Sequence, residues 1–366
     1  MKRFVLAAVF VAGWVGLCVA VAPAEDVAAP SPSQPQPRQS PQPHPFRFTL
    51  FWENDSTPLN RIEPSDRHYT NGTAIHITWP LDEPDTAIGF TLGQLMFSPE
   101  NLGPKSIITN DAPYAGYLYL GGYWQRADEH RTTLDHIQLD IGTIGESSLA
   151  EPIQKSIHEW VNADRPNGWR HQLGDEPTFQ LTYRKKWRLN LLGHDPTRTD
   201  QLIYDMAYSE QTFFDRLTGN LRVELIPAVS LSLGTVQRYA DAGGVLRLGW
   251  NMPNDFGPAR LADLASGEAL AGPQQQGLSF YVFGRATGRA VQYDHFLDGS
   301  DFQHEEHTVD SRPLVAEFQF GTAVAYHYDP FSVELNYAVT FLTDTFYHQQ
   351  YADKYGAVSL KITYWF

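Results

Sequence analysis

Apolar and polar side chains alternate along the last eleven residues of the chain. Val358, Leu360, Ile362, Tyr364 and Phe366 share one face of an extended strand, and Ala357, Ser359, Lys361 and Thr363 share the other. A period-two strand that ends on an aromatic residue is typical of the closing strand of a membrane β-barrel, which turns apolar side chains to lipid and polar ones to the lumen. The edge strand of a soluble sandwich shows the same alternation, so other segments must decide.

The same alternation recurs along the chain. The apolar faces are Phe46, Phe48, Leu50 and Trp52; Thr73, Ile75, Ile77 and Trp79; Leu314, Ala316, Phe318 and Phe320; and Phe331, Val333, Leu335, Tyr337, Val339 and Phe341. Further candidate strands lie near residues 87–97, 114–127, 131–144, 178–191, 220–236, 237–250 and 277–293. The pattern predicts an all-β fold over residues 46–366, a transmembrane antiparallel β-barrel of about twelve strands. The amphipathic segment Leu202–Asp215 does not fit this count.

The lengths of the links between these strands predict a second feature. Pro80–Thr86 and Ala127–Arg131 are short, whereas Glu53–Tyr69, Ser98–Pro113 and Gly145–Pro177 are long and alternate with them. Bacterial barrels keep short turns on the periplasmic side and long loops outside. We therefore expect the three long links to share the outer rim, where any chemistry would face the cell surface.

The N-terminal residues predict export. Basic Lys2 and Arg3 precede an apolar run, and a small-x-small site ends at Ala24, so residues 1–24 are expected to be a signal peptide. A transmembrane anchor is the alternative, but glycines interrupt the run and no basic flank follows it. Cys18, the only cysteine, would leave with the signal. Residues 25–45 are rich in Pro, Ser and Gln, which predicts a disordered linker before the barrel domain.

Composition narrows the function. A formal charge of -15 and a pI near 5.2 argue against a nucleic-acid partner. The aromatic content of 13% exceeds what a core needs and suits the aromatic girdles of a barrel in outer-membrane lipid. An acidic protein at an anionic membrane surface is also expected to work with divalent cations.

A helix is predicted inside the third long link. Ser148 would cap it, Glu151 follows three residues later, and apolar residues then recur near helical spacing. Gln154 and His158 are four residues apart and so lie on one face.

Polar residues near the long links could form a hydrolytic site. Asp55, the Asn54 carbonyl and Thr70 offer oxygen ligands for a hard cation such as Ca²⁺. His158 could act as general base on a water, with Asp164 or Gln154 orienting its ring. The alternatives are plain: an isolated Asn-Asp pair is usually a turn, and a single histidine on a surface helix is usually solvated.

Several motifs occur together in a characteristic order. They are Glu53-Asn54-Asp55, Asp66-Arg67-His68-Tyr69-Thr70-Asn71-Gly72, Asp111-Ala112-Pro113-Tyr114-Ala115-Gly116, Gly142-Thr143-Ile144-Gly145, Gln154-Lys155-Ser156-Ile157-His158 and Asn167-Gly168-Trp169. In this set the chain resembles the lipid A 3'-O-deacylase family, over nearly all of residues 46–366. The resemblance implies a monomeric outer-membrane barrel that hydrolyses the 3'-acyloxyacyl ester of lipid A, the membrane anchor of lipopolysaccharide, with Ca²⁺.

The resemblance also assigns roles to residues. By motif, Asn54 and Asp55 match the family's Asn-Asp pair, Thr70 its threonine, and His158 its catalytic histidine. The family uses a lysine before the fourth strand, and Lys105 is the only one in that link. Ala112 replaces an arginine often found in the family, which removes a salt bridge or phosphate contact there.

The proposed chemistry is attack by a His158-activated water, with Ca²⁺ and Asn54 or Lys105 stabilising the oxyanion. The chain has no Gly-x-Ser-x-Gly elbow and no His-x-Ser-Asn-Gly run. Two alternatives stay open: an outer-membrane phospholipase-type esterase, suggested by His68, and a non-catalytic barrel or pore.

Overall fold

The computed structural model describes residues 45–56, 68–193, 220–258, 260–261 and 276–366, all within the unit Pro43–Phe366. The strands are β1 (Pro45–Asn54), β2 (His68–Pro80), β3 (Thr86–Ser98), β4 (Ala115–Ala127), β5 (Thr133–Ile144), β6 (Glu176–Trp187), β7 (Leu189–Leu192), β8 (Leu221–Gly234), β9 (Gln237–Trp250), β10 (Gly277–Asp294), β11 (Leu314–Tyr328), β12 (Phe331–Leu342) and β13 (Lys354–Trp365). The helical elements of this part are η2 (Glu146–Ser148), α2 (Ala150–Val161), η3 (Trp169–His171) and α5 (His295–Asp298).

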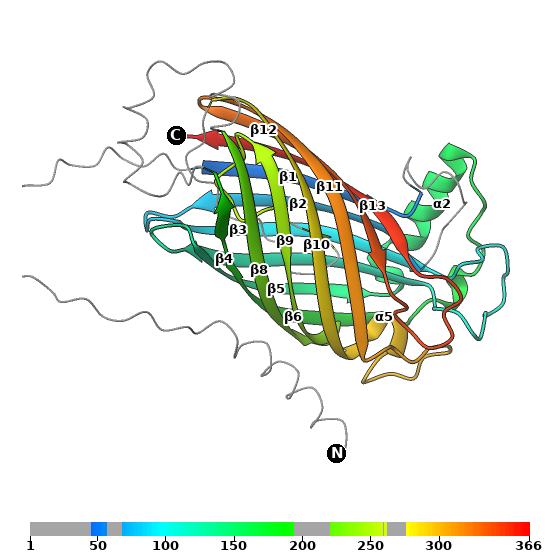
Figure 1. Ribbon diagram of the computed structural model, residues 1–366. Coiled ribbons are helices and arrows are strands. Elements are labelled where there is room, and N and C mark those ends of the chain that lie inside the picture. Colours follow the sequence, from blue (N-terminus) through cyan, green and yellow to red (C-terminus); the bar gives the residue numbers. More distant parts are fainter. Residues whose placement is uncertain (1–44, 57–67, 194–219, 259, 262–275) are drawn as a thin grey trace, which may run out of the picture. The chain divides into compact units, whose positions relative to one another are not determined.

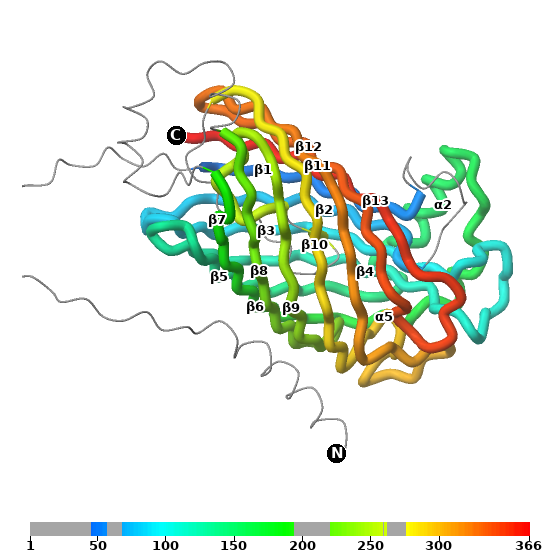
Figure 2. Tube along the Cα trace, viewed as in Figure 1, coloured from blue at the N-terminus to red at the C-terminus, as the bar shows by residue number. Residues whose placement is uncertain are grey.

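Hydrogen bonding between neighbouring strands closes the sheet. The strands pair antiparallel in chain order, β1 pairs with β13, and β6 pairs with β8. β7 follows β6 after a one-residue break and pairs with the same strand, β8, so the thirteen strands fill twelve positions around the barrel. Figures 1 and 2 show the first strand beside the last. The predicted fold class and strand number are confirmed.

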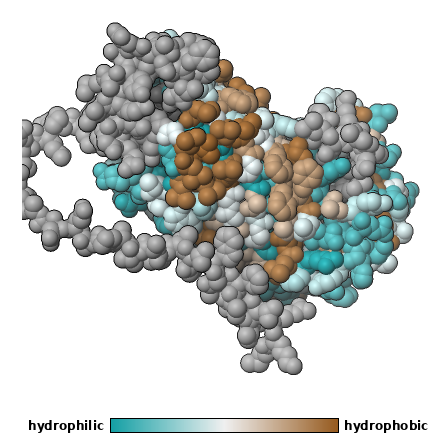
Figure 3. Space-filling view, viewed as in Figure 1, coloured by the Kyte–Doolittle hydropathy of each residue, from teal (hydrophilic) through white to brown (hydrophobic). Residues whose placement is uncertain are grey.

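Burial along the strands follows the predicted alternation. In β1, Thr49 and Glu53 are buried inside the barrel, whereas Leu50 and Trp52 between them are exposed on its outer wall. In β13, Lys361 is likewise buried beside exposed Ile362. Figure 3 shows hydrophobic side chains gathered on the barrel wall. The wall therefore presents apolar side chains where lipid would lie, and the interior holds the buried polar side chains together with apolar and aromatic clusters, such as the one around Phe51, Leu95 and Tyr117.

Some predicted segments lie outside the described residues. They are the signal peptide, nearly all of the linker and Leu202–Asp215. The linker was expected to end at residue 45, but Pro45 is already the first residue of β1. No helix in the described part of the chain is both long enough and apolar enough to cross a membrane.

The links between antiparallel strands alternate between two rims. Those at one rim, which we call the site rim, are 55–67, 99–114, 145–175, 235–236, 295–313 and 343–353. The three long links predicted to share a rim all belong to it, and Figure 1 shows α2 and α5 at this end. At the opposite rim, links 81–85 and 128–132 are short as predicted, but links 193–220 and 251–276 are long.

The second of these long links enters the lumen. We call its described part, residues 251–258, 260 and 261, the lumen segment. Its backbone reaches from the opposite rim, where β9 ends, to Glu53 near the site rim, whose Oε1 accepts a hydrogen bond from Leu261 N at 3.1 Å. Arg260 donates to the Tyr355 hydroxyl at 2.6 Å, also near the site rim. The lumen segment thus packs the inside of the barrel between the two rims.

Arg247 on β9 holds the lumen segment to the wall. Its Nε donates to Glu224 Oε2 and its Nη1 to Asp255 Oδ1, each at 2.6 Å, and Nη2 donates to the Asp255 carbonyl at 2.9 Å. Lys361 on β13 contacts the other Asp255 oxygen at 3.5 Å and Glu334 at 2.9 Å. Arg222 Nη1 also lies 3.5 Å from Glu224 Oε1, so three cations balance three buried carboxylates, and charges buried in this way must be paired.

We expect Arg247→Ala to destabilise the folded barrel by about 3 to 5 kcal/mol, because it leaves buried Glu224 and Asp255 without their main partner. Urea unfolding in detergent, followed by the electrophoretic shift between folded and unfolded barrel, measures the effect. Arg126→Ala is the control, because Arg126 is exposed at the end of β4 and should change stability by about 0.5 kcal/mol or less. Equal effects for the two variants would contradict the assigned role of Arg247.

Candidate functional site

The N-terminus of α2 rests against the barrel. Ser148 was expected to cap this helix, but it lies in η2 and donates its hydroxyl to the Gly145 carbonyl at 2.5 Å. The helix begins two residues later, after Leu149 in a left-handed conformation (φ 61°); Leu149 makes no capping bond, but Ala150 N donates to the Ser148 hydroxyl at 3.4 Å. Glycine is required opposite, because a Cβ on Gly116 would lie 2.1 Å from the Ser148 hydroxyl and 2.3 Å from the Ala150 Cβ.

This contact lies on the outer wall, not in the lumen. Met96 is on the same face of β3 as the exposed Phe90 and Leu92, but it is buried in a cluster with α2 and the loops around it. The members of that cluster are Met96, Leu102, Tyr114, Ala150 and Trp169. Gln94 on the same face donates to the Ser148 carbonyl at 2.6 Å. The helix therefore packs on the outside of the barrel, at the site-rim end of β3 and β4.

His158 and Gln154 lie on the buried face of α2, as their spacing predicted. His158 Nδ1 contacts the Asp164 carbonyl oxygen at 2.5 Å. Asp164 therefore orients the ring as predicted, but through its backbone, while its side chain is exposed.

Gln154 has a different partner, Trp169. Its Oε1 accepts from Trp169 Nε1 at 2.6 Å, and indole can only donate, so the amide orientation is determined. Gln154 Nε2 is buried and has no hydrogen-bond partner among the described residues.

The second group of predicted residues connects β1 to β2 and β3. Asp55 N and Asn54 Nδ2 donate to the Thr70 carbonyl at 3.3 and 3.2 Å. The Asn54 Oδ1 accepts from Ser56 N at 2.7 Å, so the Asn-Asp pair does form a turn. The Thr70 hydroxyl lies 2.5 Å from that of Ser98, and Asp55, Thr70 and Ser98 are all buried.

Both groups adjoin the end of β3. Ser98 and Met96 are two residues apart and so share a face of that strand; Ser98 contacts Thr70, and Met96 packs beneath α2. The link that carries Lys105 is tied to the chain after α2, because Asn167 N donates to the Leu102 carbonyl at 3.0 Å. Lys105 itself is exposed.

The donor set suits a hard cation in its chemistry. Asp55 supplies a buried carboxylate, its backbone N–H contacts the Thr70 carbonyl, and the paired hydroxyls of Thr70 and Ser98 are neutral oxygens on the same element ends. Ca²⁺ takes six to eight oxygen ligands of these kinds. The described residues hold no cluster of three or more His, Cys, Asp or Glu side chains placed for a metal ion. A cation here would therefore depend on one carboxylate and several neutral oxygens.

A network that the sequence did not predict lies inside the mouth of the barrel. His68 Nδ1 contacts Asp353 Oδ1 at 2.5 Å and its Nε2 contacts Asp111 Oδ1 at 3.0 Å, so one imidazole joins three site-rim elements. Burial alone would raise the pKa of Asp111, but its hydrogen bonds to His68 and to the Glu100 and Ala112 N–H groups lower it. Ala112 replaces the arginine often found in the family at this position, but Asp111 still has a side-chain partner, His68.

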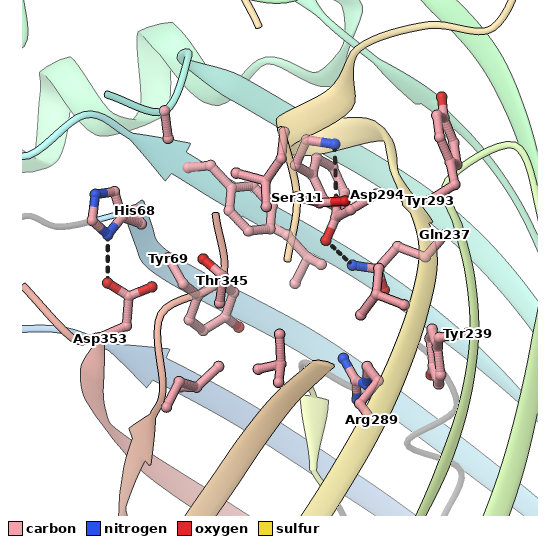
Figure 4. A pocket seen from close by; sticks show the side chains of 18 of the residues that line it. His68, Tyr69, Gln237, Tyr239, Arg289, Tyr293, Asp294, Ser311, Thr345 and Asp353 are labelled. Carbon is pink, nitrogen blue, oxygen red and sulfur yellow. Dashed lines mark hydrogen bonds and ion pairs between the residues drawn. The ribbon is translucent and has the colours of Figure 1, made fainter. Parts of the chain in front are cut away.

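A cavity of about 100 Å³ lies beside this network on the lumen side. Figure 4 shows His68 with Asp353 on one flank, Asp294 with Gln237 on another, and Arg289 near Tyr239. The described residues that line it include none of the seven predicted site residues. The predicted residues lie on the outer wall instead, so we place the candidate site there.

Comparisons with known proteins agree with this fold. A family model described as "Outer membrane protein LpxR" matches residues 11–364. The chain belongs to this family. It is therefore an outer-membrane β-barrel, and the apolar wall described above is its lipid-facing surface. No curated protein matches the chain.

Solved structures show the same architecture. LpxR from Salmonella typhimurium is 21% identical, with a TM-score of 0.64 over 87% of this chain and 100% of that one. At this identity the likeness shows the fold alone. The β domain of the Bordetella autotransporter BrkA is 11% identical, and the match covers 89% of this chain and 100% of that one. Its TM-score of 0.41 is too low to indicate a shared fold.

We expect His68→Asn to loosen the site-rim links, because an amide cannot join both carboxylates as the imidazole does. Limited proteolysis of the folded barrel should then cut links 99–114 and 343–353 faster than in the wild type. His171→Asn is the control: His171 contacts Glu306 at 2.7 Å, but that glutamate is 60% exposed, so little should change.

Low pH should have the same effect on the wild type. Since folding lowers the pKa of Asp111, its contribution to stability is complete at neutral pH and is lost as the pH falls through that lowered value. Cleavage that is insensitive both to acid and to His68→Asn would contradict this role.

Proposed function

We propose that this chain is a Ca²⁺-dependent lipid A 3'-O-deacylase, with its site rim at the cell surface. Membership of the LpxR family and the outer-membrane barrel support this, as do the buried polar residues gathered on the outer wall. A site on the lipid-facing side of the barrel suits a substrate that is itself a membrane lipid. Lipid A could reach such a site without leaving its leaflet.

The contact between His158 and Asp164 carries the proposal. A carbonyl oxygen can only accept, so His158 Nδ1 must hold a proton for this 2.5 Å contact to be a hydrogen bond. A neutral imidazole with its proton on Nδ1 has its lone pair on Nε2. That nitrogen can take a proton from a water molecule, as a general base requires.

The reaction would be simple ester hydrolysis. Water adds to the ester carbonyl carbon as His158 takes its proton, and the tetrahedral intermediate then releases the sugar oxygen, which recovers the proton from His158. The products are a fatty acid and a free 3'-hydroxyl. Asp55 and Thr70 would hold Ca²⁺, which when bound would polarise the ester carbonyl.

Hydrogen-bond donors near the site could stabilise the oxyanion. Lys105 and Asn54 were considered for this role; one N–H of the Asn54 amide donates to the Thr70 carbonyl, and the amide carries a second. The exposed Lys105 and the buried Nε2 of Gln154 are the other candidates.

Neither alternative has an observation in its favour. The lumen segment packs the barrel interior, with Asp255 and Phe256 each 1% exposed, which argues against an open pore. The phospholipase interpretation depended on His68, whose ring joins Asp111 and Asp353 between the site-rim links.

We expect His158→Ala to reduce deacylation by a factor of about 10² to 10⁴, the usual effect of losing a general base. Mass spectrometry of lipid A from a heterologous outer membrane that expresses each variant measures the loss of the 3' chain. His171→Ala is the matched control, because it is a nearby histidine outside the proposed site. Unchanged deacylation by a folded His158→Ala barrel would exclude the mechanism.

Metal dependence is tested separately. EGTA should abolish deacylation by the purified barrel, and added Ca²⁺ should restore it, because Asp55 supplies the proposed site's one carboxylate. Asp55→Asn should raise the Ca²⁺ concentration needed for half-maximal activity, whereas Asp164→Asn should not, since Asp164 acts through its carbonyl. Full activity in EGTA would remove Ca²⁺ from the proposal.

A further inference from the structure

Helix α2 carries an exposed apolar stripe that the site does not use. Its members are Leu149, Ile153, Ile157, Trp160 and Val161, all exposed, with Trp160 86% exposed. Large apolar side chains gathered in this way normally mark a binding surface. The sequence predicted an apolar stripe on this helix, but such a stripe usually packs against the protein, whereas this one is exposed.

The stripe has a definite position around the helix. At about 100° per residue, Leu149, Ile153, Ile157 and Trp160 centre roughly a quarter turn to one side of the buried face of Ala150, Gln154 and His158, whereas Val161, the last helical residue, falls within the arc of that face. Charged Glu151, Lys155 and Glu159 lie roughly a quarter turn to the other side. The buried face thus separates an apolar flank from a charged flank. A helix that lies at a membrane surface, with one flank toward lipid and one toward water, has this arrangement.

The wall beneath the helix continues into the lipid-facing surface. Along β3, Phe90 and Leu92 are exposed outward, and Met96, farther along the same face, is covered by α2. Along β4, Leu120 is exposed outward, whereas Gly116 lies beneath Ser148 and Ala150. The helix therefore begins where the apolar wall ends, so its apolar flank extends a surface already assigned to lipid.

We propose that this apolar flank inserts among the acyl chains of the outer leaflet, so that α2 is an interfacial helix. Trp160 suits the boundary between acyl chains and headgroups, where tryptophan is enriched. This membrane contact is inferred from the fold and from membership of an outer-membrane family, so it does not depend on the proposed function. Its consequence rests on the proposed function: the inserted helix would hold His158 at the depth of the lipid A esters.

Fluorescent labelling tests the contact without reference to activity. In a Cys18→Ser background, Trp160→Cys and, separately, Glu159→Cys are labelled with an environment-sensitive dye. Each full barrel is then placed in vesicles of phosphatidylethanolamine and lipopolysaccharide, with brominated acyl chains on the phospholipid. The dye at position 160 should emit at shorter wavelength and be quenched, whereas the dye at position 159, on the charged flank, should do neither. Equal, water-like emission at both positions would overturn the proposal.

A second measurement links the contact to the reaction. Trp160→Ser should lower deacylation of lipopolysaccharide in vesicles by about tenfold and leave hydrolysis of detergent-dispersed substrate nearly unchanged. Equal losses in both media would overturn the positioning role. Retained activity of His158→Ala would instead overturn the proposed function, while the labelling result would still decide the membrane contact.

Discussion

Closure of the sheet is the constraint on which the rest of this molecule depends. In hydrocarbon no water is present to satisfy backbone N–H and C=O groups, and each unpaired group costs several kcal/mol. The pairing of β1 with β13 and of β6 with β8 leaves no free edge in the barrel. Closure also decides which residues become neighbours, because it brings Glu53 on β1 beside β13 and Tyr355 near the lumen segment.

A closed barrel of this width has an interior to fill, and this chain fills it with polar contacts. The lumen segment is held by Arg247, Lys361 and Arg260, each paired with carboxylates from the wall or from the segment. Such pairs fix position more than they add stability, because removing charges from water offsets much of their attraction. The proposed site lies instead on the outside of the wall, where α2 and the ends of β2 and β3 form a second, smaller polar group.

Sequence reasoning was accurate for the strands and for the face of α2, and incomplete for the site. The period-two alternation predicts strands because a barrel wall has two solvents, lipid and lumen, and each residue must suit one of them. Gln154 and His158 share a face because helical geometry requires it. The cap predicted at Ser148 is shifted: Leu149 is the N-cap residue, while the Ser148 hydroxyl donates to the Gly145 carbonyl and accepts a long hydrogen bond from Ala150 N. Local spacing does not determine where the preceding turn ends.

The sequence by itself predicted the strands, their approximate number and the rim shared by the first three long links, because these follow from local periodicity and from the alternation of link lengths; it did not predict the two long links at the opposite rim. Only the tertiary structure decided that Ser98 joins Thr70, that Trp169 orients Gln154, and that His68 joins Asp111 to Asp353. These contacts join residues far apart in the chain, and their partners are set by how strands register and loops fold over them. The same is true of the outer-wall position of α2, which depends on a glycine at 116 small enough to let the helix approach.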